Sequence, residues 1–151
     1  MHLLLWRHAD AVAGFPDHER ALSDKGRLQA KRMAAWLNTH LPPDTVVLVS
    51  PALRAQQTAR ALKREFTTCT ALDTSTDCAS LLKALGPCKH QGTTLIVGHQ
   101  PTLGHVASLL LTGAEGELSV KKAAVWWLTL GRESKAHAVL RAVMTPEMLS
   151  G

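Results

Sequence analysis

The sequence predicts an α/β fold: a three-layer α/β/α sandwich around a mostly parallel sheet with an antiparallel edge. Three short apolar runs, residues 2–6, 46–49 and 94–97, have the length and composition of buried strands. Segments of helical character separate them, and strands that alternate with helices form parallel sheets through right-handed crossovers. Two alternating segments, 120–130 and 138–144, predict the antiparallel hairpin at the edge.

The helices follow from capping signals and apolar spacing. Ser23 is a suitable N-cap for a helix that runs to about His40, after a loop over residues 9–22. Its expected apolar face consists of Leu28, Met33, Trp36 and Leu37. Pro51 suits the first turn of a second helix, which we expect to end near Phe66. On that helix, the polar run from Gln56 through Gln57 to Thr58 is expected to face solvent.

The second half of the chain predicts two more helices. One covers residues 78–85 and ends at Gly86, and the other ends at about Leu111. Residues 67–77 are rich in Thr and Asp, which is typical of a loop with at most a short strand. The antiparallel hairpin would turn across residues 131–135.

The composition predicts a single domain over residues 1–151. With 46% hydrophobic and 19% charged residues, the chain is too apolar to be disordered. No apolar run approaches the roughly 20 residues that span a bilayer, and the N-terminal run lacks the features of a signal peptide. Cys69, Cys78 and Cys88 fit neither a disulfide framework nor a zinc pattern. We therefore expect a cytoplasmic protein with reduced thiols and no membrane partner.

The net charge of +5 favours anionic substrates or acidic partners through electrostatic steering. The chain has few aromatic residues, with Trp 4, Phe 2 and Tyr 0, and they are not interleaved with basic residues. Nucleic acid is therefore not an expected partner.

Polar side chains follow each of the three predicted buried strands. They are Arg7 with His8, Ser50 with the nearby Arg54, and His99. Ligands of open α/β sheets bind outside the carboxyl ends of the strands, so we expect these residues to converge. Two guanidinium groups and two imidazoles suit a phosphate-like anion, because arginine matches phosphate oxygens in a bidentate manner.

On these residues the sequence resembles the histidine phosphatase superfamily, whose fold is phosphoglycerate-mutase-like. Within it, the chain is most similar to the short bacterial phosphohistidine phosphatases of the SixA type. The stretches that carry the resemblance are LWRHADA at 5–11, RALSDKGRLQA at 20–30, VSPALRAQQTA at 49–59 and VGHQP at 97–101. One departure is Ala9, where the family usually has glycine, which leaves the loop geometry to be tested.

The resemblance implies covalent catalysis by His8, with Arg7, Arg54 and His99 binding the phosphoryl oxygens. It also implies that Arg20 and Asp17 contact the substrate at the rim, and that neither a metal nor a cofactor takes part. Ser50 is a further candidate for a hydrogen-bond donor to phosphate. Alternatively, its hydroxyl stabilises a turn before Pro51. The proton donor for the leaving group stays open, and the acidic candidates are Asp10, Asp73 and Asp77.

The expected function is removal of a phosphoryl group from phosphohistidine on a signalling or phosphotransfer protein. The segment from 66 to 92 is too short for a large lid, so a side chain projecting from a folded protein could enter. Phosphate and its mimics should bind the same residues. The alternatives are a phosphomonoesterase for a small metabolite, a module that binds phosphoprotein without catalysis and, less favoured, a mutase.

Overall fold

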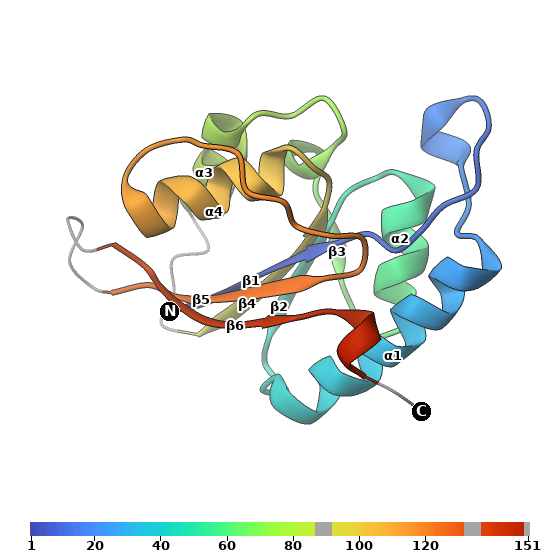
Figure 1. The fold of residues 1–151 in the computed structure, drawn as a ribbon, viewed down its shortest axis with the longest axis horizontal. Helices are drawn as coiled ribbons and strands as arrows, with labels where there is room; N and C mark the ends of the chain where they lie inside the picture. The colour runs from blue at the N-terminus through green and yellow to red at the C-terminus, as the bar shows by residue number, and fades with distance from the viewer. Residues whose placement is uncertain (87–91, 132–136, 150–151) are drawn as a thin grey trace.

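The computed structural model describes residues 1–86, 92–131 and 137–149 (Figure 1). Its centre is a six-stranded sheet in the order β3-β2-β4-β1-β5-β6. The strands are β1 (His2–Arg7), β2 (Val46–Val49), β3 (Thr67–Thr68), β4 (Thr93–Gly98), β5 (Val125–Thr129) and β6 (Val139–Met144). β1, β2, β3 and β4 are parallel to one another, whereas β5 pairs antiparallel with both β1 and β6. The predicted parallel sheet with an antiparallel edge is confirmed.

Helices cover both faces of the sheet (Figure 1). They are α1 (Asp24–His40), α2 (Leu53–Arg60), α3 (Cys78–Leu85) and α4 (Thr102–Thr112). Side chains alternate between the faces of a strand, and in β1 they separate two cores. Leu4 and Trp6 pack with residues of α1 and α2, whereas Leu3 and Leu5 pack with residues of α3 and α4. The predicted three layers follow from this division.

The first turn of α1 packs against the loop that follows β1 and is hydrogen-bonded to it. Ser23 is its N-cap, as predicted, and its hydroxyl accepts a hydrogen bond from Gly26 N at 3.0 Å. The Ser23 N–H donates to the carbonyl of Asp10 at 3.0 Å. A Cβ at Gly26 would lie 1.9 Å from that carbonyl oxygen, so only glycine allows this close approach.

Two details of the predicted helices were wrong. Leu28 is 47% exposed, because the buried stripe of α1 runs through Ala30, Met33 and Leu37 instead. α2 begins after Pro51 and ends at Arg60 rather than near Phe66. Lys63 has a φ of 55°, a left-handed conformation in which a helix cannot continue.

The two strands of the predicted hairpin pair as β5 and β6, but β5 begins at Val125 rather than at residue 120. Most of the expected turn lies outside the described residues. Among the residues that are described, no helix combines the length and apolarity required to cross a membrane.

Candidate active site

Three neighbouring parallel strands end at one edge of the sheet and bring the predicted polar residues together. In the register of β1 and β4, Arg7 lies opposite Gly98. The next residue, His8, donates its backbone N–H to the Gly98 carbonyl at 3.1 Å. After β2, Ser50 N donates to the carbonyl of Val97 at 3.0 Å. The segments after all three strands are thus fastened to each other.

His8 is held as a neutral imidazole with one free nitrogen. Its side chain is buried, and its Nδ1 lies 2.8 Å from the carbonyl of Ala9. A carbonyl only accepts hydrogen bonds, so Nδ1 carries the hydrogen and Nε2 keeps its lone pair. Burial lowers the pKa of His8 to about 3 against the opposing effect of the hydrogen bond to Ala9, and electrostatic interactions with His99, Arg54 and Arg7 lower it further. A neutral imidazole with a free Nε2 is a nucleophile.

Two guanidinium groups lie in the same electrostatic environment. Arg54 is buried, and its two terminal nitrogens donate to the backbone carbonyl and the carboxylate of Asp17, at 2.9 and 3.0 Å. Arg7 donates to the carbonyl of Val120 at 3.1 Å. Burial lowers the pKa of Arg7, and the charge of Arg54 adds to that effect. Two guanidinium groups whose charges act on each other and on His8 favour the binding of an anion.

His99 completes the cluster. Its ring centroid lies 5.2 Å from that of His8. Its Nε2 is 2.7 Å from the hydroxyl oxygen of Ser50, and its side chain is buried. Burial lowers the pKa of His99 to about 4, with Arg54 and Arg7 lowering it further and Asp73 and Asp17 opposing them. His99 is therefore neutral at physiological pH and can donate one ring N–H.

The cluster contains buried polar atoms that no atom of the described residues satisfies. Five buried side-chain polar atoms among the described residues lack a hydrogen-bond partner. Three of them belong to the cluster: Nε of Arg7, Nε of Arg54 and Nδ1 of His99. Buried polar groups are normally paired, so unpaired ones gathered in one place indicate where a ligand binds. Nitrogen donors of this kind suit the oxygens of a phosphoryl group.

Asp17 and Arg20 are joined at the edge of this cluster. The Asp17 carboxylate accepts from Arg20 and from Arg54, both at 3.0 Å, and its side chain is 52% exposed. Arg20 also donates its Nε–H to the carbonyl of Val12 at 2.8 Å. The Asp17 carboxylate thus bridges Arg54 and Arg20, and the contact of Asp17 and Arg20 with substrate stays a prediction.

Two of the three acidic candidates are engaged away from the cluster. Asp10 accepts from Lys122 at 2.9 Å and from the Ser23 hydroxyl at 2.6 Å, and these hydrogen bonds lower its pKa. Asp77 is the N-cap of α3 and accepts from Ser80 N at 2.8 Å, which lowers its pKa. Both carboxyl groups are ionised at neutral pH and already bound, which does not favour either as an acid.

Asp73 is the acidic candidate whose charge reaches the cluster, since it raises the pKa of His99. Burial raises the pKa of Asp73, but hydrogen bonds from His18 and Thr74 N, both at 2.7 Å, outweigh burial and lower it. His18, which the sequence left without a role, therefore links the loop after β1 to the loop before α3.

Thr58 is a supporting residue that the sequence reasoning missed. It is fully buried rather than solvent-facing. Its hydroxyl accepts from Ala9 N at 3.0 Å and donates to the Arg54 carbonyl at 2.7 Å, so it links the residue after His8 to α2. Gln57 likewise turns inward and accepts from Leu22 N at 2.7 Å. The backbone of Ala9 does not have a positive φ, so an alanine fits here without strain.

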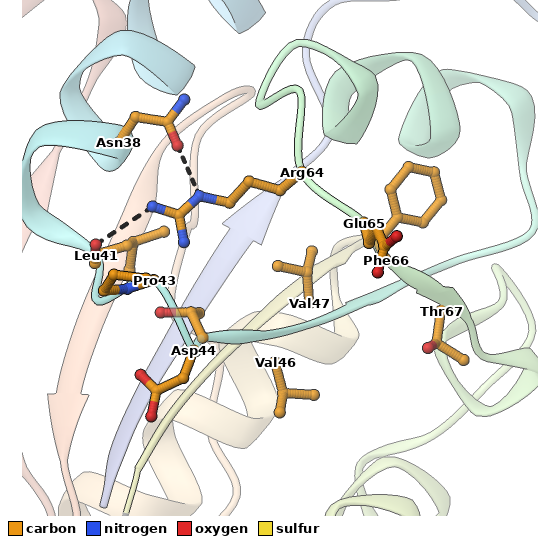
Figure 2. A pocket seen from close by; sticks show the side chains of 11 residues that line it. Asn38, Leu41, Pro43, Asp44, Val46, Val47, Arg64, Glu65, Phe66 and Thr67 are labelled. Atoms are coloured by element: carbon orange, nitrogen blue, oxygen red, sulfur yellow. Dashed lines mark hydrogen bonds between the residues drawn. The ribbon is translucent and has the colours of Figure 1, made fainter.

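A separate hollow of about 940 Å³ lies at the other end of β2, where the strand begins at Val46. Figure 2 shows Arg64 in its wall, with its guanidinium donating to Asn38 and Leu41. A third donor of Arg64 bonds to the carbonyl of Pro42. Because this guanidinium is already satisfied, the hollow offers no cation comparable to those beside His8.

A parallel sheet whose strand ends present two imidazoles and two guanidinium groups around an anion site defines a phosphoryl-handling protein of the histidine phosphatase class. Residues 3–78 match the sequence profile of the histidine phosphatase superfamily (branch 1). The chain belongs to this superfamily and is a phosphatase.

Within the superfamily, the chain is similar to SixA. It is 30% identical to the phosphohistidine phosphatase SixA of Escherichia coli K12 over 129 residues, which cover 75% of this chain and 76% of that protein. It is 35% identical over 124 residues to the uncharacterized protein ML1117 of Mycobacterium leprae, covering 72% and 71% of the two chains. A solved structure of SixA complexed with tungstate superposes with a TM-score of 0.81 at 25% identity, covering 99% of this chain and 100% of that one.

Proposed function

We propose that this phosphatase uses His8 as a covalent nucleophile and removes phosphoryl groups from phosphohistidine on a protein. The proposal is carried by the combination of a neutral His8, whose Nε2 is free, with buried nitrogens of Arg7, Arg54 and His99 that have no partner among the described residues. A module that only binds phosphoprotein needs the donors but has no use for a free nucleophilic nitrogen.

In the first step, Nε2 of His8 forms a bond to phosphorus while the bond from phosphorus to the leaving atom breaks. The electron pair of that bond goes to the leaving atom, which takes up a proton. In the second step, water attacks the phosphohistidine at His8, and phosphate leaves while His8 regains its lone pair. Arg7, Arg54 and His99 stabilise the charge that spreads over the equatorial phosphoryl oxygens.

Four considerations support a phosphohistidine substrate. The similar E. coli protein is named as a phosphohistidine phosphatase. The leaving nitrogen of a phosphohistidine is easier to expel once protonated than an alkoxide, so a dedicated acid is less necessary. Asp10 and Asp77 are bonded to Lys122 and Ser80, so neither is poised as an acid, which agrees with a phosphohistidine substrate. The net charge of +5 favours an acidic phosphoprotein.

The test compares kcat/KM for a phosphohistidine-containing phosphotransfer protein with kcat/KM for small phosphate esters such as p-nitrophenyl phosphate and a sugar phosphate. We expect a clear preference for the phosphohistidine protein, with His8→Asn inactive on all substrates. A preference for a small ester would instead make the chain a phosphomonoesterase for metabolites. If wild type binds the phosphoprotein tightly but does not hydrolyse it, the chain is a phosphoprotein-binding module rather than an enzyme.

A further inference from the structure

Ser50 lies behind His99 with every polar group held by the protein. Its backbone N–H donates to Val97 O at 3.0 Å, and its backbone carbonyl accepts from Gln56 Nε2 at 2.8 Å. Its hydroxyl is 2.7 Å from Nε2 of His99 and accepts from Ala52 N at 3.2 Å. Ser50 has no exposed surface. The hydroxyl is therefore fixed between His99 Nε2 and Ala52 N, out of reach of bulk water.

The hydrogen bond between Ser50 and His99 can be made in two directions, which differ in what they leave unpaired. If the hydroxyl donates to Nε2, its hydrogen is bonded to His99 and its oxygen still accepts from Ala52 N. The ring hydrogen of the neutral His99 is then on Nδ1. If Nε2–H donates to the hydroxyl instead, the hydroxyl hydrogen has no acceptor among the described residues, and Nδ1 is an unpaired acceptor as well.

The first direction leaves one unpaired group, and the second leaves two. Unpaired buried polar groups are costly, so the first direction is the more stable one. Its single unpaired group is a buried N–H donor in the cluster of Arg7, Arg54 and His8. A phosphoryl oxygen satisfies such a donor, whereas the lone pair that the second direction leaves on Nδ1 would repel that oxygen.

We propose that Ser50 is a positioning residue that fixes His99 in the tautomer with its hydrogen on Nδ1, and so makes His99 a hydrogen-bond donor to the transferred phosphoryl group. This inference rests on the proposed function. It replaces the expectation that the Ser50 hydroxyl itself donates to the phosphate, because that hydroxyl has a single hydrogen and His99 takes it.

The direct test is NMR of the ring nitrogens in the full-length, ¹⁵N-labelled protein without phosphate at neutral pH. A His99→Asn variant identifies the His99 signals, because they disappear from its spectrum. We expect the ring hydrogen of wild-type His99 on Nδ1. A hydrogen on Nε2 would overturn the proposal, and this measurement decides the matter without any variant of Ser50.

Two variants then connect the tautomer to catalysis. Ser50→Ala removes the hydroxyl, so we expect the ring hydrogen to shift toward Nε2 and kcat to fall by roughly ten-fold or more with little change in KM, because the lost donor acts in the transition state. Ser50→Thr keeps a hydroxyl and should keep both the tautomer and most of kcat. Unchanged tautomer and kcat in Ser50→Ala would contradict the proposal.

The two proposals fail in different ways. A wild-type protein that turns over no phosphorylated substrate refutes the proposed function, although the tautomer can still be measured. An active wild-type protein whose His99 carries its hydrogen on Nε2 refutes only the role of Ser50.

Discussion

At the scale of single residues, function depends on which protonation state and which hydrogen-bond partners the fold imposes. His8 and Arg54 illustrate this. The carbonyl of Ala9 binds Nδ1 of His8 and so leaves Nε2 free, and Asp17 accepts hydrogen bonds from the two terminal nitrogens of Arg54. The sequence predicted that Asp17 would belong to the site, but not that its carboxylate would bind Arg54. The partner of a charged side chain depends on tertiary contacts, which here join residues 37 positions apart.

Replacing Asp17 tests whether it positions Arg54. In Asp17→Ala the buried guanidinium loses a charged partner, and hydrogen bonds to charged groups contribute about 1.5–3 kcal/mol. We expect kcat/KM to fall by about ten-fold, because a mobile Arg54 stabilises the phosphoryl group less well. Asp17→Asn keeps an oxygen that accepts from Arg54 and should retain most of the activity. Steady-state kinetics on one substrate would check this, and a rise in kcat/KM for Asp17→Ala would show that Asp17 obstructs the site.

At the scale of secondary-structure elements, the strands and most helix boundaries could be predicted because their signals are local. The three apolar runs became β1, β2 and β4, and the residues after them met as expected. The end of α2 could not be predicted, since the left-handed Lys63 leaves no mark in the apolar spacing. Nor could the inward turn of Thr58, whose partner Ala9 is 49 residues away.

The close approach of α1 to the loop after β1 gives a prediction for Gly26. In Gly26→Ala the new methyl group would overlap the Asp10 carbonyl, so the loop that carries His8 must move. We expect a loss of about 1–3 kcal/mol in the free energy of unfolding, as for other overpacked sites, together with reduced activity. Gly86→Ala is the matched control, because a Cβ at Gly86 meets no atom of the described residues within 4 Å. Chemical denaturation of both variants would show equal stabilities if the contact were unimportant.

At the scale of the whole molecule, the fold keeps two neutral histidines buried beside two arginines. This arrangement makes the folded protein less stable at low pH. The folded pKa values of about 3 for His8 and about 4 for His99 lie below the ordinary 6.5. The unfolded chain therefore binds more protons than the folded protein as the pH falls below about 6.5. Stability is lost from there down to the folded pKa values, at up to about 1.4 kcal/mol per pH unit for each histidine.

Denaturation curves between pH 7 and pH 4.5 would measure this loss. We expect the free energy of unfolding to decrease steadily over that range, and to decrease less in the double variant His8→Asn, His99→Asn. Equal slopes for the double variant and wild type would mean that the two histidines take up protons over the same pH range in the folded and the unfolded protein, which contradicts their lowered pKa values.

The most direct test of the central claim is to trap the covalent intermediate. Wild-type protein, His8→Asn and the control His105→Asn, whose histidine lies in α4 with its Nε2 3.9 Å from Glu117, are mixed with a ³²P-labelled phosphohistidine protein. The reactions are quenched in alkaline detergent, which preserves phosphohistidine. Mass spectrometry then locates the modified residue. We expect label on His8 in wild type and in His105→Asn, and none in His8→Asn. Labelling of His8→Asn to the wild-type level, or label on another histidine in wild type, would contradict it.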